Sequence, residues 1–114
     1  MKKSINILNK QINYQILNHK IHFILNDEVD IKTISLLSSE IKKIITEISA
    51  ISEIEFDISN FTYIDSLMLG ELMRIKKRLQ NENIKFRLIN PSAKVKFIIE
   101  SASFEPFLLE GENW

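Results

Sequence analysis

The chain has 114 residues, the length of one domain, and its hydrophobic fraction of 45% supports one core without room for a second domain. Its 15 basic and 15 acidic side chains give a formal net charge of zero, which argues against a nucleic-acid-binding surface and against membrane attachment by bulk electrostatics. There is no cysteine and no apolar stretch near the ~20 residues of a membrane span, so we exclude disulfides and expect a cytoplasmic protein.

Alternating apolar and polar residues predict the strands. Tyr14 and Ile16 indicate a first strand, which a turn at Asn18 and His19 would join to a second strand as a hairpin. Half-buried strands are predicted at residues 21–25, 54–58 and 84–88, where apolar side chains alternate with charged ones. We therefore expect about four to five strands, beginning with an N-terminal hairpin.

Between these strands the apolar period becomes helical, which predicts three amphipathic helices. Asn90 and Pro91 fit the start of the third helix, with Asn90 as its cap. Strand–helix–strand crossovers require parallel pairing, so the predicted fold is α/β with a mixed sheet and helices mainly on one face. The three apolar stripes are Ile31, Ile34, Leu37, Ile41, Ile44, Ile45 and Ile48; Met68, Leu72, Ile75 and Leu79; and Val95, Ile98, Ile99 and Ala102.

The polar faces of the strands predict their order. The strand at 54–58 alternates with acidic residues, whereas the strands at 21–25 and 84–88 alternate with basic ones. Opposite charges on neighbouring strands attract each other by roughly 0.2 to 1 kcal/mol per pair, and like charges repel. The acidic strand is therefore predicted to lie between the two basic strands.

Catalytic and metal-binding patterns are absent from the sequence. His19 and His22 would point to opposite faces of a hairpin, so a shared metal is not expected. No Gly-rich phosphate loop is present, and no activating base stands near Ser66 in the sequence. We therefore predict that the protein is not an enzyme and that it holds no metal and no cofactor.

Other polar residues are interpreted as solvated helix faces. These residues are Ser35, Ser38, Ser39, Arg74, Lys76, Lys77 and Arg78. Gly70 interrupts a helical pattern at a cost of about 1 kcal/mol against alanine. It indicates either close approach of the helix to the sheet or a neighbouring loop, or a tolerated weak position.

Asp65 and Ser66 open the second predicted helix. Unpaired backbone N–H groups and partial positive charge at a helix start stabilise an anion such as a phosphate. Ser66 is therefore a candidate for phosphorylation, while the alternative is that Asp65 or Ser66 only caps the helix. Local features alone leave both interpretations open.

Residues 56–78, FDISNFTYIDSLMLGELMRIKKR, resemble the signature of the STAS domain, the family of the bacterial anti-sigma factor antagonists. The likeness continues upstream in ILNDEVDIKTISLL and downstream in IKFRLINPSAKVKFIIESASFEPFLLE, where the family has a strand–helix unit and a hydrophobic C-terminal strand. It implies a single STAS domain over residues 1–114, with a core at about 13–110 and short tails. The matching residues are Phe56, Asp57, Ile58, Ser59, Asn60, Ile64, Asp65, Ser66, Leu69, Gly70 and Leu72.

The resemblance implies a phosphorylation-controlled binding module. In the family, the unmodified protein binds an anti-sigma factor that is also an ATP-dependent serine kinase, and a sigma factor is released to RNA polymerase. The kinase phosphorylates the serine that matches Ser66 and lets go, and a serine phosphatase restores binding. Because loops at the ends of parallel strands converge, we predict a partner face that comprises Asn26, Asp27, Glu28, Asn60, Phe61, Asp65, Ser66, Leu67 and Met68.

The chain departs from the family pattern beside Ser66. Met68 stands where the pattern has glycine, and Leu67 stands where a small residue is common. These apolar side chains would either obstruct a kinase or anchor a different partner. The alternative function is therefore a constitutive STAS adaptor subunit of a lipid-transport or stress-signalling assembly, in which Ser66 only caps its helix.

Overall fold

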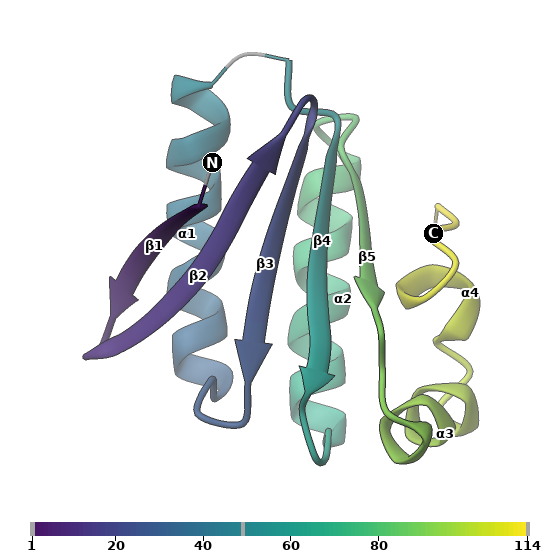
Figure 1. Cartoon of the computed structure of the whole chain (residues 1–114). Helices are drawn as coiled ribbons and strands as arrows, with labels where there is room; N and C mark the ends of the chain where they lie inside the picture. The colour runs from purple at the N-terminus through teal and green to yellow at the C-terminus, as the bar shows by residue number, and fades with distance from the viewer. Residues whose placement is uncertain (1, 49, 114) are drawn as a thin grey trace.

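Five strands form one mixed sheet in the computed structural model, which describes residues 2–48 and 50–113 (Figure 1). Their order across the sheet is β1-β2-β3-β4-β5. Neighbours among the first three strands are antiparallel, whereas β3 pairs with β4, and β4 with β5, in parallel. This confirms the predicted α/β fold and its mixed sheet. The strands are β1 (Lys2–Ile7), β2 (Lys10–Leu17), β3 (Lys20–Asn26), β4 (Glu53–Asn60) and β5 (Lys85–Ile89).

The N-terminal end of the sheet extends beyond the prediction. The hairpin through Asn18 is present, with Asn18 at a φ of 57°. A second hairpin precedes it, because β1 pairs with β2 through a turn at Leu8 and Asn9, whose φ values are 52° and 65°. The segment before Asn13, which we expected to be a tail, is therefore part of the sheet.

The two long helices cover one face of the sheet (Figure 1), which confirms the prediction of helices mainly on one face. Both α1 (Ile31–Glu47) and α2 (Ser66–Gln80) lie behind the strands, while α3 (Ala93–Ser101) and α4 (Glu105–Leu108) lie beside the β5 edge (Figure 1). Between sheet and helices, the ring of Phe56 contacts those of Phe23 and Phe86 edge-on, with centroids 5.6 and 4.9 Å apart. No helix in the described part of the chain is long and apolar enough to cross a membrane.

Two predictions for the C-terminal part are wrong. Ser92, not Asn90, caps α3, because its Oγ accepts a hydrogen bond from the Val95 N–H at 3.2 Å. Asn90 instead has a φ of 57° and donates from Nδ2 to Asp57 Oδ2 at 3.1 Å. The expected hydrophobic C-terminal strand is the short helix α4, with Pro106 at its N-terminal end, where the missing N–H of proline costs little.

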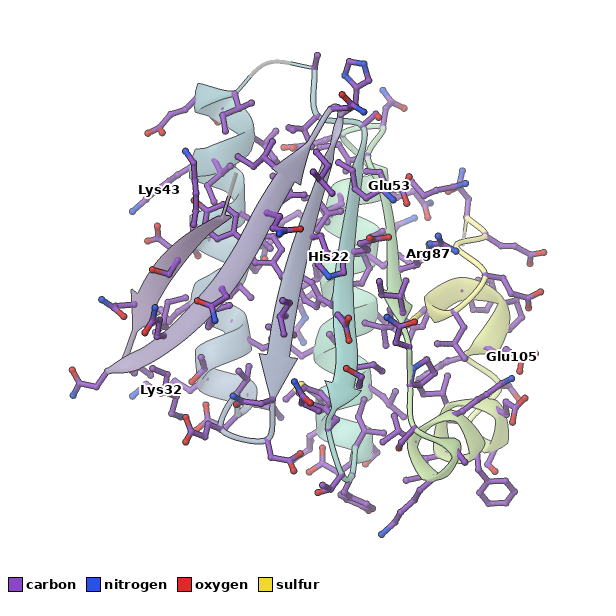
Figure 2. All side chains as sticks on the ribbon, in the orientation of Figure 1. His22, Lys32, Lys43, Glu53, Arg87 and Glu105 are labelled. Atoms are coloured by element: carbon purple, nitrogen blue, oxygen red, sulfur yellow. The ribbon has the colours of Figure 1, made fainter. Side chains whose placement is uncertain are left out.

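The predicted strand order is confirmed. Acidic β4 lies between basic β3 and β5, and Figure 2 shows His22, Glu53 and Arg87 on these three neighbouring strands. Glu55 is the centre of the cross-strand contacts, since its Oε1 lies 2.8 Å from His22 Nδ1 and its Oε2 lies 3.6 Å from Lys20 Nζ. These neighbours leave Glu55 only 6% exposed on the face without helices.

Part of the predicted solvated helix surface is buried. Lys76 is 2% exposed, and its Nζ donates to the Phe86 carbonyl at 3.3 Å. Arg78 donates from Nη1 to Ser38 Oγ at 2.7 Å, and Ser38 is itself 6% exposed. The error arose because charged and hydroxyl side chains were assigned to the outer faces of the helices, although α2 packs against β5 at Lys76 and against α1 at Arg78.

Candidate functional site

Two loops meet at the ends of the central parallel strands. One loop follows β3 and contains Asp27, and the other follows β4 and contains Thr62. The Asp27 carboxylate accepts from the Thr62 N–H at 2.9 Å and from the Thr62 hydroxyl at 2.7 Å. These bonds hold the pKa of Asp27 below its usual value. The structure therefore ties together the two loops that carry most of the predicted site residues.

The loop after β3 is ordered by its own polar side chains. Asn26 Oδ1 accepts from the Glu28 N–H at 2.9 Å. Asp30 caps α1 by accepting from the Thr33 hydroxyl at 2.7 Å and the Thr33 N–H at 2.9 Å. These bonds from Thr33 lower the pKa of Asp30 to about 2, so its carboxylate stays charged at neutral pH.

Asp65 and Ser66 have separate places at the start of α2. Asp65 is the cap, because its Oδ1 accepts from the Met68 N–H at 2.8 Å. Ser66 is the first residue of the helix and is exposed, and its hydroxyl has no hydrogen-bond partner within residues 2–48 and 50–113. The expectation that Ser66 itself caps the helix, on which the adaptor alternative relied, is therefore wrong.

The apolar residues around Ser66 differ in exposure. Leu67 is 70% exposed, whereas Met68 and Phe61 are 8% and 4% exposed. Phe61 and Met68 line a cavity of about 190 Å³ between the two loops, together with Asp27, Asp30 and other loop residues. Phe61 and Met68 therefore form part of the cavity wall, and of the three side chains only Leu67 exposes a large area to a partner.

Two features beside Ser66 were missed from the sequence. Tyr63 is 57% exposed in the loop before α2, and Lys94 Nζ from α3 lies 5.5 Å from its ring centroid. An aromatic residue in a loop between a predicted strand and helix was the signal that could have identified it. Of the predicted partner residues, Glu28 lies in the loop after β3 and Asn60 is the last residue of β4, and both are exposed.

Gly70 lies one turn after Ser66 and is exposed. A Cβ built there would meet nothing within 4 Å, so of the two interpretations of Gly70, close approach to the sheet or a neighbouring loop is wrong. The domain itself gives no packing reason for a glycine at this position of the helix. Ser66, Leu67 and Gly70 are thus all exposed on the first turns of α2.

No metal centre is found in the described residues, where no group of three or more His, Asp or Glu is placed to hold an ion. His19 and His22 do not converge. His19 Nδ1 lies 3.0 Å from the Ala50 carbonyl, while the two ring nitrogens of His22 face Glu55 and Asp57. The site thus consists of hydrogen-bonded loops and an exposed serine.

Comparison with known proteins identifies the family of the chain and structures of similar fold. The model of the STAS domain family matches residues 11–112. The fold is similar to that of the anti-sigma factor antagonist SpoIIAA in its unphosphorylated form, with a TM-score of 0.69 and 17% identity over 86% of this chain and 85% of SpoIIAA. No curated protein matches the chain in sequence.

Two further structures share the fold. The phosphorylated form of SpoIIAA, described as a Bacillus cell fate determinant, gives a TM-score of 0.64 at 16% identity over 86% of this chain and 88% of its own. The protein TM1081, solved by NMR, gives 0.72 at 21% identity over 84% and 76% of the two chains. At these identities the likeness concerns the fold.

Proposed function

Because the chain belongs to the STAS domain family, we propose that it is a protein-binding module that acts as an anti-sigma factor antagonist and is switched off by phosphorylation of Ser66. The observation that carries this proposal is the exposed Ser66 hydroxyl at the first position of α2, which Asp65 leaves free by capping the helix. The proposed activity is binding, without catalysis or a cofactor.

The physical chemistry of the helix start supports a switch of this kind. A phosphate adds about −1.5 to −2 charges, and the N-terminal end of a helix stabilises such an anion. The same phosphate would lie beside the Asp65 carboxylate at the edge of a contact surface, where it would repel an acidic partner and would lose its hydration against an apolar one. We therefore expect phosphorylation to leave the fold intact while weakening the complex more than a hundredfold, or by about 3 kcal/mol.

The proposed partner is an anti-sigma factor with ATP-dependent serine kinase activity, and a serine phosphatase would reverse the modification. SpoIIAA, whose fold this chain shares, has structures in both phosphorylated and unphosphorylated forms. The proposed contact surface comprises the exposed residues of the two loops and the open first turns of α2. We place this binding in the cytoplasm, in keeping with a chain that has no cysteine.

Affinity capture tests the proposal directly. Wild type, Ser66→Ala and Ser66→Asp would serve as baits in a lysate of the source organism with ATP. We expect wild type and Ser66→Ala to retain an ATP-binding kinase that Ser66→Asp loses, and wild type alone to gain a phosphate at Ser66. If all three baits hold the same partner and none of them gains a phosphate, the proposed phosphorylation switch is wrong.

The second candidate is a constitutive adaptor of a larger assembly, of the lipid-transport or stress-signalling type. The observation that favours it is Leu67, which at 70% exposure places an apolar side chain next to Ser66. Such a side chain anchors a partner without any modification. The adaptor is supported if Leu67→Ala releases the captured partner and Ser66→Asp does not.

A further inference from the structure

A groove crosses the outer surface of the helix layer, away from Ser66. It lies between the C-terminal half of α1 and the last turn of α2, and it has a volume of about 680 Å³. Arg78 links the two helices at the groove, because its Nη1 donates to Ser38 Oγ of α1 at 2.7 Å. The groove is lined by Ser39, Lys42, Lys43, Thr46, Glu47 and Arg78.

The groove is predominantly basic. Three of its lining residues are cations and one, Glu47, is an acid, although the whole chain has a formal net charge of zero. Within the described ranges the Lys42 side chain makes no hydrogen bond or ion pair, and Lys43 pairs only with Glu40 at 3.3 Å, where the Lys43 side chain is 70% exposed. An exposed pair of this kind contributes little, so both lysines remain available to an external anion.

The position of these lysines is not explained by the helix dipole. Cations stabilise a helix when they lie in its last turn, close to the free carbonyl groups. The last turn of α1 contains no basic residue, so Lys42 and Lys43 lie before it. Internal packing does not explain them either, since both are exposed.

We propose that this groove binds an acidic segment of a protein partner, with its carboxylates paired to Lys42, Lys43 and Arg78. A concave, positively charged surface between two helices complements an extended or helical chain rich in Glu or Asp. A membrane surface fits less well, because peripheral helices insert large apolar side chains. No exposed large hydrophobic residue of the described chain lines this groove.

The groove and the Ser66 surface are separate. Ser66 begins α2 and Arg78 lies in its last turn, twelve residues later. At the rise of an α-helix this separation is about 18 Å. The two surfaces can therefore be occupied at the same time, and the groove proposal does not depend on the phosphorylation of Ser66.

Fluorescence anisotropy with the full chain tests the proposal. The probe is a labelled helical peptide of about three turns with glutamate on one face and alanine elsewhere, and its matched control has glutamine in place of glutamate. We expect saturable binding of the Glu peptide at low salt, weaker binding at high salt, and at least tenfold weaker binding to Lys42→Gln/Lys43→Gln. Lys32→Gln should retain wild-type affinity, because Lys32 and Lys43 lie at opposite ends of α1 (Figure 2).

Several results would overturn the proposal. These are equal binding of the Gln peptide, unchanged affinity of the double variant, or loss of affinity in Lys32→Gln to the same degree. Two further measurements cover the other occupants. If the chain binds phosphatidylglycerol vesicles and not the Glu peptide, the groove is a membrane contact; if sedimentation shows self-association that the double variant abolishes, its occupant is a second copy.

Discussion

At the scale of single residues, the two polar residues that open α2 divide two tasks. Asp65 holds the helix start through its bond to the Met68 N–H, and Ser66 makes no bond that the fold requires. The neighbouring pair therefore combines a structural carboxylate with a hydroxyl that is free for modification. This division is the reason to expect that stability and binding respond to different residues.

Substitution of the two residues separates these tasks. Asp65→Ala should lower the free energy of unfolding by about 1 kcal/mol, because the cap of α2 is lost. Ser66→Ala should change it by less than about 0.5 kcal/mol, as expected for an exposed side chain without partners. Urea unfolding measures both, and a cost for Ser66→Ala equal to that for Asp65→Ala would contradict the assignment.

Gly70 gives a prediction in the opposite direction. Gly70→Ala should raise the free energy of unfolding by about 1 kcal/mol, because alanine favours the helix and its Cβ meets nothing within 4 Å. If the partner surface extends along α2, the same change should weaken binding. The control is Gly111→Ala, which should destabilise the chain because Gly111 has a φ of 76°. Thermal unfolding measures the stability of both variants, and a pull-down measures partner binding by Gly70→Ala. Destabilisation by Gly70→Ala would contradict the structure.

Asp30 predicts how stability depends on pH. Its pKa is lowered from 3.8 to about 2 by the bonds from Thr33, so the charged form adds stability above 3.8 and loses it as the pH falls toward about 2. The difference in unfolding free energy between wild type and Asp30→Asn should therefore be constant near neutral pH and shift against wild type below about pH 4. Urea unfolding across this range measures it, and a difference that never changes with pH would refute the assignment.

At the scale of elements, the cross-strand contacts of β3, β4 and β5 bury a charged residue on the open face of the sheet. Glu55 receives contacts from His22, Lys20 and Arg87, whereas Glu53 pairs with Arg87 at 3.7 Å and is more exposed. The central strand is thus held by charge as well as by the core beneath it. Its register places Lys20 beside Glu53 and His22 beside Glu55.

The two acidic residues of β4 should differ in their contribution to stability. Glu55→Gln should cost roughly 1–2 kcal/mol, since a nearly buried group loses its charged partners, although water screens Lys20 and Arg87. Glu53→Gln should cost less than about 0.5 kcal/mol, since its single ion pair is partly exposed. Chemical unfolding of the two variants compares them, and an equal loss for both would show that Glu55 is not the centre of the network.

Strands were predicted well where the pattern of residues within a single segment is enough to identify them. Strict alternation identified β3, β4 and β5, and the charges on these strands identified their order. The strand β1 was missed because it contains only two apolar residues, Ile5 and Ile7, and this alternation is too short to indicate a strand. Its pairing with β2 is what defines it. Lys76 and Ser38 were assigned to the surface because a charge or hydroxyl usually lies there, and only the packing of α2 against α1 and the sheet shows that they are buried.

The candidate site was predicted in outline. The motif placed Ser66 at a helix start, but the sequence left open whether Ser66 or Asp65 forms the cap, and the Asp27–Thr62 bond joins residues 35 positions apart. The exposure of Tyr63 and Gly70 and the burial of Met68 also depend on how the loops and α2 pack. Such features arise from tertiary contacts that a linear pattern does not contain.

At the scale of the whole molecule, the two ends of the helix layer differ in character. The end that contains Ser66 also carries Asp27, Asp30 and Asp65, while the opposite end carries the basic groove of Lys42, Lys43 and Arg78. At the Ser66 end, cations offset part of this acidic charge, since Lys10 pairs with Asp30 and Lys94 lies over the Tyr63 ring, whereas the groove has an excess of positive charge. We expect the chain to bind its regulatory partner at the first end and an acidic segment at the second.

The most direct test of the proposed switch uses the chain with phosphoserine installed at position 66 by genetic encoding. Titration of the captured kinase partner into the unmodified and phosphorylated chains measures both dissociation constants, while circular dichroism checks that the fold is the same. The proposal predicts an intact fold and affinity at least about a hundredfold weaker for the phosphorylated chain. Equal affinity for the two forms would contradict it.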